Sequence, residues 1–361
     1  MHSAGMQHSP EAPAPSNLVQ PLETLVIEDF GVFVGKHSER LRVSLKGEVK
    51  VEAPLLYLRQ VIVKGRGVSL STDLLLACAE RGIAVHVVGY QAGASLYTDG
   101  LTGTVQTRRS QLLAYDDTRG VELAIAIAQA KLRNQAGLLR YHARSRKQTA
   151  PDTSQELKVI AAEVDDHQAE LDDLAGRGAS AISDLRPALL SIEGRAAQRY
   201  WKGVKCLVPG ELNWEGRRHR GARDAFNSAL NYGYAILARQ VEQAIVLAGL
   251  DPFAGFVHVD RPGKPSLTLD LIEEFRQAVV DRVVLGMVNR SVALPMTDTG
   301  MLQDEARKAL AHAVIGRIEE SAEPYEGKRR TLREIIQSQA RHIATVLRGQ
   351  RPQHQGFVAK W

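Results

Sequence analysis

Short apolar runs with alternating polar positions fill the chain from Leu22 to about Thr98. The runs are rich in β-branched residues, are separated by Gly, Lys or Asp, and read TLVIED, GVFVGK, RLRVSL, QVIVKG, IAVHVVG and ASLYT. Such alternation is typical of β-strands. One stretch among them, TDLLLACAERG, has the spacing of a helix. We therefore predict a small N-terminal β-strand domain with one helix over residues 22–100.

The pattern changes after the segment DGLTGTVQTRR, where apolar positions begin to recur every three or four residues. This spacing starts near Val121 and continues through ELAIAIAQAKLRNQAGLLRYHARSR. It predicts further helices over 154–174, 180–202, 220–249, 269–290, 303–320 and 328–348. We predict a large all-α domain over residues 101–350, a C-terminal tail over 351–361, and an α+β fold class for the whole chain.

The first 21 residues, MHSAGMQHSPEAPAPSNLVQP, lack the basic and apolar regions of a secretory signal. Their composition predicts a disordered arm over residues 1–21. No apolar run reaches the ~18 residues of a membrane span, so we expect no membrane association. The two cysteines, Cys78 and Cys206, are far apart, which excludes a disulfide framework and a zinc ribbon and fits a reducing cytoplasm.

Basic residues are unevenly spread over the 361 residues, with 46 Lys and Arg against 41 Asp and Glu and a net charge of +5. They crowd one Gly-containing loop near Trp214, at Arg217, Arg218, Arg220 and Arg223. Guanidinium groups suit phosphate oxygens, so the loop is a candidate DNA-binding segment. The alternative is a solvated basic loop without a ligand. Arg261 and Lys264 are further candidates for DNA binding.

A carboxylate stands within the apolar face of the helix AISDLRPALLSIEGRAAQRYWKG. At 100° per residue, Glu193 falls inside the stripe formed by Ile182, Leu185, Leu189, Ile192, Ala196 and Tyr200. A buried carboxylate must be paired, protonated or bound to a metal. Pairing with Arg195 or Arg199 would explain Glu193 without any catalytic role.

The stretch GFVHVDRPGKPSLTLDLIEEFR brings one histidine and several acidic residues close together in sequence. Asp270 and Glu273 share one face near a helix start, and His258 precedes them. One imidazole with carboxylate oxygens suits Mg²⁺ or Mn²⁺, whereas the absence of cysteine ligands counts against structural zinc. The alternative is that the two acids only favour the helix dipole and that His258 is a structural histidine.

A polar stripe also runs along the helix between these two segments. Asn227 and Asn231 are four residues apart, and Tyr234 lies one turn further on nearly the same face. Amide side chains here could orient a ligand or close a buried hydrogen-bond network. The spacing leaves both roles open.

Three segments, SIEGRAAQRYW, FNSALNYGYAIL and GFVHVDRPGKPSLTLDLIEEFR, together resemble the CRISPR-associated integrase and endonuclease family, the metal-dependent subunit of spacer acquisition. The resemblance covers residues 22 to 348, and it implies Glu193, His258 and Glu273 as ligands of Mg²⁺ or Mn²⁺. Asp270 matches a further acidic position of the family near the metal. It would be either an alternate ligand or a residue that contacts a ligand and not the metal itself. The supporting residues around the site would be Tyr200, Asn227, Asn231 and Tyr234. The chain departs from the family in its first 20 or so residues and in EEFRQ, which lacks a proline common after that Arg.

The activity implied by the resemblance is DNA strand transfer, in which the 3′-hydroxyl of a captured double-stranded fragment attacks a phosphodiester at the border of a CRISPR leader and repeat. Metal-dependent nicking is the hydrolytic form of this displacement. The family works as homodimers, joined through the N-terminal domain and bridged by a small ferredoxin-like adaptation partner. Whether an end-trimming nuclease joins the complex is left open. A metal-dependent, structure-selective nuclease without array integration and a purely structural DNA-binding subunit are the alternatives.

Overall fold

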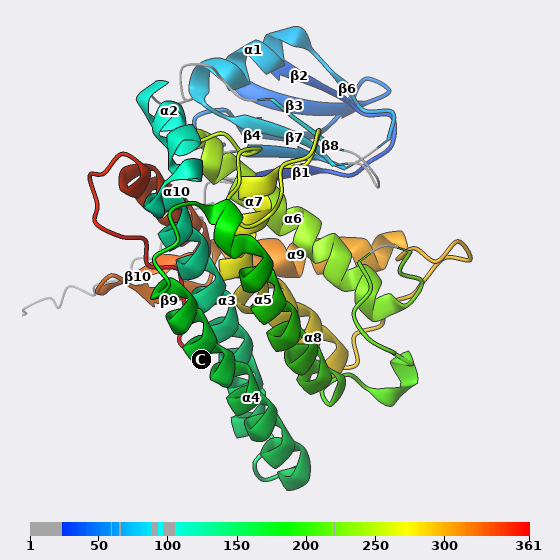
Figure 1. The fold of residues 1–361 in the computed structure, drawn as a ribbon. Helices are drawn as coiled ribbons and strands as arrows, with labels where there is room; N and C mark the ends of the chain where they lie inside the picture. The colour runs from blue at the N-terminus through cyan, green and yellow to red at the C-terminus, as the bar shows by residue number, and fades with distance from the viewer. Residues whose placement is uncertain (1–23, 59, 65, 89–92, 97–104, 220) are drawn as a thin grey trace, which may run out of the picture. The chain divides into compact units, whose positions relative to one another are not determined.

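The computed structural model describes residues 24–58, 60–64, 66–88, 93–96, 105–219 and 221–361. The predicted arm over residues 1–21 and the predicted DNA contact Arg220 lie outside the described residues. The chain divides into two compact units, residues 1–99 and 100–361, and each has a hydrophobic core of its own. Figure 1 shows the first unit as mainly strands and the second as mainly helices, so the predicted α+β class is confirmed.

The N-terminal unit contains two four-stranded sheets. The first sheet has the order β1 (Thr24–Ile27), β5 (Gln60–Val63), β7 (Ala84–Val88) and β8 (Gly93–Leu96). Its first three strands are parallel, and β8 is antiparallel to β7. The second sheet has the order β4 (Glu48–Pro54), β3 (Arg40–Leu45), β2 (Phe33–His37) and β6 (Ser69–Leu70).

Helix α1 (Thr72–Arg81) of this unit has clear boundaries in the sequence. The hydroxyl of Ser71 accepts a hydrogen bond from the backbone N–H of Leu74, which caps the first turn. Gly82 ends the helix in the left-handed region at φ 69°, where a side chain would be strained. Strand β4 was not among the predicted strands, although EVKVE alternates polar and apolar residues; in the structure the first four residues of this strand are all exposed.

Large apolar side chains remain exposed on the N-terminal unit. Leu56 is 81% exposed and Phe30 77%, and smaller exposed fractions are found at Leu76, Val49, Phe33, Tyr57 and Val51. Large exposed apolar side chains can take part in protein–protein contacts when they lie together on a surface. These side chains are therefore candidates for contact with another chain.

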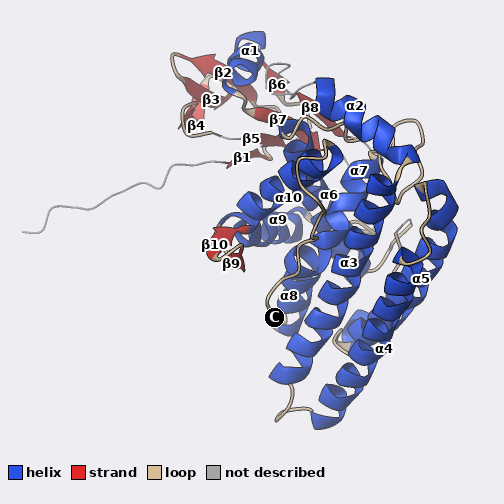
Figure 2. Ribbon diagram, turned by 60° about the vertical axis from the view of Figure 1, so that its left-hand side comes forward, coloured by secondary structure: helices blue, strands red, loops and turns tan. Residues whose placement is uncertain are grey.

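Helices and two short strands form the C-terminal unit. Its α-helices are α2 (Val105–Leu113), α3 (Thr118–Ser145), α4 (Pro151–Ala175), α5 (Ile182–Lys205), α6 (Ala225–Leu247), α7 (Ser266–Leu271), α8 (Arg282–Asn289), α9 (Asp304–Glu319) and α10 (Leu332–Leu347), and short 3₁₀ helices cover Ala114–Asp116 and Gly210–Leu212. Figures 1 and 2 show the long helices α3, α4 and α5 side by side. None of the helices in the described part of the chain combines the length and the apolar character that a membrane crossing requires.

The helix predicted over residues 269–290 is interrupted in the structure. After α7 the chain tightens into a 3₁₀ helix, η4 (Ile272–Glu274), and then widens into a π-helix, η5 (Gln277–Asp281), before α8 begins. Such interruptions change which side chains share a face, and π segments are frequent at functional sites. Apolar residues are regularly spaced through this segment, so the sequence pattern predicted one continuous helix and not the 3₁₀ and π segments.

The prediction that the second unit is all-α is wrong at one place. Strands β9 (Ala322–Tyr325) and β10 (Lys328–Thr331) form an antiparallel hairpin, and β10 replaces the start of the helix predicted over 328–348. Glu326 and Gly327 both have positive φ, 46° and 77°, as a two-residue hairpin turn requires. Lys and Arg are good helix formers, so the composition of β10 favoured a helix that the turn prevents.

The C-terminal tail, residues 351–361, packs against the helical unit. His354, Phe357 and Ala359 are buried. The Nδ2 group of Asn134 on α3 donates to the backbone oxygens of Glu274 (2.9 Å) and Phe357 (2.8 Å), and its Oδ1 accepts from the N–H of Ala359 (2.9 Å). The tail thereby fixes the segment that carries Glu273 and Glu274 against α3.

Candidate functional site

Two carboxylates from different helices converge on one ammonium group. The Nζ of Lys131 lies 3.3 Å from Oε1 of Glu193 and 3.2 Å from Oε2 of Glu273. The side chains of the two acids are 8% and 5% exposed, and that of Lys131 is 14% exposed. We call Glu193 and Glu273 the carboxylate pair. Residues far apart in sequence thus meet in one buried charge cluster.

The helices explain why each acid points inward. Glu193 lies in the apolar stripe of α5, as the wheel predicted, and this stripe is buried from Ile182 to Tyr200. Its ion-pair partner is Lys131 on α3, so the expected alternatives Arg195 and Arg199 are wrong. Those two arginines pair with Glu170 and Glu163 on α4.

Glu273 and Glu274 are neighbours with different surroundings. The carboxylate of Glu274 accepts hydrogen bonds from Nε2 of His354 and from the N–H of Phe357, both at 2.8 Å. The carboxylate of Glu273 pairs with Lys131 and, through Oε1, with Arg276 at 3.0 Å. Glu273 and Glu274 are consecutive residues of η4, so their side chains leave the helix in different directions. The side chain of Glu274 holds the C-terminal tail, and that of Glu273 joins the cluster with Lys131.

The charges of the cluster stabilise one another. Burial raises the pKa of Glu273, but Arg276, Lys131 and His258 outweigh it and lower the pKa from 4.5 to about 2. Burial lowers the pKa of Lys131, yet the carboxylate pair raises it above its ordinary value. Glu273 and Lys131 are therefore both charged at neutral pH.

Asp270 orients His258. Its Oδ1 lies 2.7 Å from Nδ1 of His258 and accepts from the backbone N–H of the same residue, while Oδ2 accepts from the N–H groups of Phe256 (2.6 Å) and Val257 (3.0 Å). With Nδ1 directed at a carboxylate, the imidazole presents Nε2 to another partner. Asp270 is fully buried and its oxygens are engaged, which suits it to hold His258 rather than to bind a ligand itself.

The donor set suits a hard divalent cation. Oε2 of Glu273 is buried and accepts no hydrogen bond from any described residue, although it pairs with Lys131. The carboxylate pair already surrounds a positive charge, and His258 offers a nitrogen. Among the residues that the structure describes, no three His, Cys, Asp or Glu side chains gather tightly enough to hold a metal as they stand. Carboxylate oxygens with one imidazole are donors that Mg²⁺ or Mn²⁺ can use, so a metal at these residues stays a prediction. In this structure the ammonium of Lys131 lies between the two carboxylates.

A further buried carboxylate, Asp281, was not among the residues predicted from the sequence. The hydroxyls of Tyr200 and Tyr234 donate to its two oxygens. Burial raises the pKa of both tyrosines well above the ordinary value, so they stay protonated. The guanidinium of Arg276 lies 4.9 Å from the ring centre of Tyr234, which links this group to Glu273. The sequence signal was available, since Asp281 interrupts the apolar run AVVDRVVLG just as Glu193 interrupts its stripe.

The asparagine stripe of α6 holds the basic loop. Oδ1 of Asn231 accepts from Arg217 at 2.7 Å, and Oδ1 of Asn227 accepts from Arg217 at 3.1 Å and from the backbone N–H of Arg218 at 2.9 Å. The guanidinium of Arg217 also faces the ring of Tyr234 at 5.4 Å. Burial and Arg217 lower the pKa of His219 to about 4, so its ring is neutral at pH 7. The network role is the one that these contacts support for both asparagines.

The predicted DNA contacts differ in their surroundings. Arg217 turns inward to the network described above, whereas Arg218, Arg223 and Arg261 are exposed. Arg218 pairs with Glu215 at 2.7 Å, and Lys264 donates to the backbone oxygen of Val259 at 3.3 Å. Contact with DNA stays a prediction for this set.

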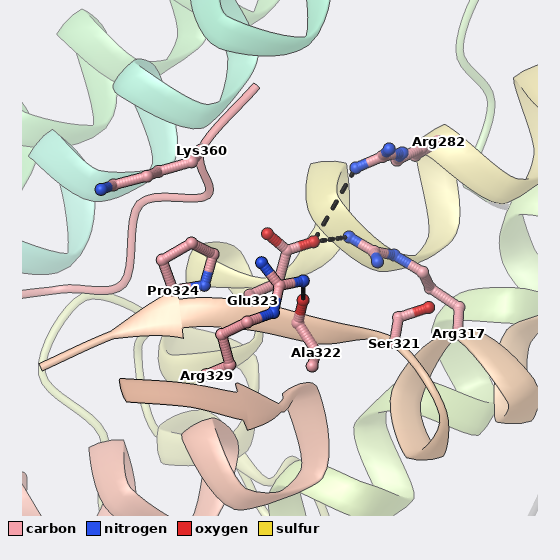
Figure 3. A pocket seen from close by; sticks show the side chains of 8 residues that line it. All are labelled: Arg282, Arg317, Ser321, Ala322, Glu323, Pro324, Arg329 and Lys360. Atoms are coloured by element: carbon pink, nitrogen blue, oxygen red, sulfur yellow. Dashed lines mark hydrogen bonds and ion pairs between the residues drawn. The ribbon is translucent and has the colours of Figure 1, made fainter. Parts of the chain in front are cut away.

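A basic pocket of about 470 Å³ lies elsewhere on the helical unit. Figure 3 shows Arg282 and Arg317 directed at Glu323, with Arg329 and Lys360 on other walls of the pocket. Arg317 is 2.5 Å from Oε1 of Glu323. None of the predicted site residues lines this pocket, so the carboxylate pair belongs to a separate site.

Comparisons with known proteins agree on one family. A family model described as CRISPR associated protein Cas1 matches residues 25–315. The chain is 36% identical over 349 residues to the CRISPR-associated endonuclease Cas1 1 of Archaeoglobus fulgidus, a match that covers 93% of this chain and 99% of that protein.

Two solved structures share the fold. A casposase bound to integration product has a TM-score of 0.76 and 21% identity, with 92% of each chain covered. A chain of a Cas6-RT-Cas1–Cas2 complex has a TM-score of 0.70 and 20% identity, over 96% of this chain and 37% of that chain. At these identities the likeness shows the fold alone.

The pKa of Asp281 predicts a pH-dependent stability. Burial raises this pKa from 3.8 to about 6, although the tyrosine hydroxyls and Arg276 act in the opposite direction. The folded state therefore binds the proton more tightly, and the stability that this proton provides is complete below about pH 4 and is lost as the pH rises through 6. Relative to Asp281→Asn, the wild type should lose up to about 3 kcal/mol of unfolding free energy between pH 4 and 7.

Urea unfolding followed by circular dichroism at several pH values measures this difference. Asp298→Asn, an exposed position, is the matched control and should follow the wild type throughout. A wild-type-to-Asp281→Asn difference that stays constant from pH 4 to 7 would show that Asp281 is ionised normally.

Proposed function

The chain belongs to the CRISPR-associated Cas1 family, and from that premise we propose that it is the integrase of CRISPR adaptation. It joins captured double-stranded DNA fragments to a CRISPR array by attack of the fragment's 3′-hydroxyl on a phosphodiester at the border of leader and repeat. Nuclease activity is the same displacement with water as the nucleophile. The described curated relative is named an endonuclease, and one structural neighbour holds an integration product, which supports this proposal.

One observation carries the proposal: the buried acids Glu193 and Glu273, from helices far apart in the chain, converge on the single ammonium group of Lys131. For DNA binding alone, two buried carboxylates bring no advantage, because they repel phosphate and cost free energy to bury. A phosphodiester enzyme does need them, since carboxylates hold the divalent cation that offsets the charge of the reacting phosphate.

Glu193, Glu273 and Nε2 of His258 would hold Mg²⁺ or Mn²⁺. When bound, the metal polarises the phosphate and stabilises the charge that develops on its oxygens. Asp270 keeps the imidazole in one orientation by accepting from Nδ1 and from three backbone N–H groups. Arg276 neutralises Glu273 and is itself held over Tyr234, so the polar groups are in place before substrate arrives.

The basic loop would contact the DNA backbone. Arg218 and Arg223 are exposed at the end of the loop that Asn227 and Asn231 anchor to α6. Arg261 and Lys264, in the turn after His258, add positive charge near the same site. Contacts with phosphate set affinity without reading sequence, so repeat recognition would require further groups or a partner protein.

The protein would act as a homodimer with a small bridging partner. Exposed apolar side chains on the N-terminal unit offer a contact surface between two copies. One structural neighbour is a chain in a Cas1–Cas2 complex, which supports a partner of the Cas2 kind. Two protomers would hold the two ends of one DNA fragment, so that both 3′-hydroxyls are oriented for attack.

Removing any of the three proposed ligands should abolish the chemistry. Glu193→Gln, His258→Ala and Glu273→Gln should each reduce Mn²⁺-dependent cleavage and joining at least about 100-fold, because the metal supplies several kcal/mol of transition-state stabilisation. Asp270→Asn should cost about 10- to 100-fold, since it only orients a ligand. Rates are measured on a labelled duplex, with circular dichroism to verify the fold. Full activity of Glu193→Gln would exclude this site.

Neutralising the basic loop should weaken DNA binding without regard to sequence. The double variant Arg218→Ala with Arg223→Ala should flatten the dependence of log affinity on log salt by about one unit of slope per lost phosphate contact. Fluorescence anisotropy at several salt concentrations measures the slope. Lys158→Ala with Lys205→Ala removes two exposed charges elsewhere and should leave it unchanged. An unaltered slope in the loop variant would mean that the loop is only a solvated surface.

Charging the exposed apolar surface should separate the dimer. Leu56→Asp introduces a carboxylate at a side chain that is 81% exposed, so the monomer should tolerate it while a dimer contact would not. Sedimentation velocity should show a shift from dimer to monomer. Leu190→Asp on α5, where the side chain is 41% exposed, is the control and should remain dimeric. A dimeric Leu56→Asp protein would place the contact on another surface.

The distinction between an integrase and a general nuclease lies in the nucleophile. The protein with its small partner, Mn²⁺ and a plasmid carrying leader and repeat should join a labelled duplex fragment covalently to the repeat ends. Fragments with 3′-deoxy ends should not be joined, although hydrolysis of the target should persist because water can replace the missing hydroxyl. Joining is followed by transfer of the label to the plasmid. Equal joining of 3′-deoxy fragments, or no joining with cognate partner and array, would refute the integrase mechanism.

A further inference from the structure

Lys131 occupies the centre of the proposed metal site with its own positive charge. It extends from α3, its side chain is 14% exposed, and its Nζ lies 3.3 Å from Glu193 and 3.2 Å from Glu273. Neither the apolar pattern nor the family resemblance singled this residue out. A lysine on an amphipathic helix is normally solvated, so its place between two buried acids requires an explanation.

The charges of this cluster already balance without a metal. Glu193 and Glu273 carry two negative charges, and Lys131 and Arg276 carry two positive charges. A divalent cation added to this set would leave an excess of two positive charges in a poorly solvated space, which is unfavourable. Metal binding therefore requires either that a positive group leaves or that negative charge enters with the metal.

Lys131 and Arg276 differ in how readily they can leave. Arg276 is held by Oε1 of Glu273 at 3.0 Å and lies on the ring of Tyr234 at 4.9 Å, next to the tyrosine–Asp281 group. Lys131 has contacts only with the carboxylate pair among the described ion pairs and hydrogen bonds, and a flexible four-carbon stem carries its ammonium. Lys131 is thus the group that can move.

We propose that Lys131 is a built-in cation that competes with the divalent metal for Glu193 and Glu273 and turns to a DNA phosphate when DNA and metal enter together. This inference rests on the proposed function for the identity of the metal ligands. It makes the metal site weak in the free protein and strong in the DNA complex, because the phosphate supplies the negative charge that the displaced ammonium needs. By linkage, metal must strengthen DNA binding by the same factor.

Direct measurement of Mn²⁺ binding tests the competition. Free Mn²⁺ is followed by electron paramagnetic resonance for the wild type, Lys131→Met, Lys131→Gln and the exposed-lysine control Lys205→Met. Without DNA, both neutral Lys131 variants should bind Mn²⁺ at least tenfold more tightly than the wild type, and Lys205→Met should match the wild type. A short DNA duplex should tighten Mn²⁺ binding to the wild type at least fivefold, and clearly less in the Lys131 variants.

Thermal unfolding provides a readout that does not depend on activity. In EDTA, Lys131→Met should unfold at a lower temperature than the wild type, because the carboxylate pair has lost a counter-charge. Mn²⁺ should raise the unfolding temperature of Lys131→Met by more than it raises that of the wild type. If both neutral variants fail to fold even when purified in Mn²⁺, the proposal is wrong, since the metal should replace the missing ammonium.

The outcomes separate this inference from the proposed function. If Lys131→Met and Lys131→Gln bind Mn²⁺ no more tightly than the wild type, while Glu193→Gln and Glu273→Gln lose it, the metal site stands and the competition is refuted. If Glu193→Gln and Glu273→Gln bind Mn²⁺ as the wild type does, the ligand assignment itself fails. A wild-type affinity that DNA does not change would refute the coupling between phosphate and metal.

Discussion

Ionised side chains inside the helical unit must be matched by opposite charge, and the rest of the site depends on this constraint. An unpaired buried carboxylate costs several kcal/mol, so Glu193 and Glu273 can stay ionised only beside Lys131 and Arg276. Because the four groups come from α3, α5 and the segment after α7, the pairing also fixes how these elements pack. The charge cluster is therefore a structural contact as well as the proposed place of the chemistry.

The polar groups around the cluster keep its members from rearranging. The two tyrosines hold Asp281, Arg276 lies on one of their rings, and Asn134 with the tail holds the backbone of Glu274 beside Glu273. Each of these groups has a partner within the protein. Preorganisation of this kind lowers the cost of binding a charged substrate, since the donors and acceptors do not have to be reoriented at the time of reaction.

The separation between anchored and exposed arginines suits an enzyme that acts on a polymer. Arg217 and Arg276 point inward, where they hold the loop and Glu273, while Arg218 and Arg223 are exposed. The basic pocket lined by Arg282 and Arg329 belongs to another part of the unit. In this protein, buried charge therefore indicates the candidate site better than the pocket does. Substrates as large as DNA require a surface and not an enclosed cleft.

The sequence by itself determined the succession of strands and long helices and the burial of Glu193, because apolar periodicity is a local property of the chain that survives in any packing. It also contained the three segments that mark the family. Only the tertiary structure decided that Lys131 rather than Arg195 pairs with Glu193, that Asp270 holds His258, and that Glu273 and Glu274 diverge through a 3₁₀ turn. The hairpin of β9 and β10 likewise followed from the positive φ of its turn and not from residue propensity. Charge pairing depends on which helices become neighbours, and that is set by the packing of the whole unit, which no single segment encodes.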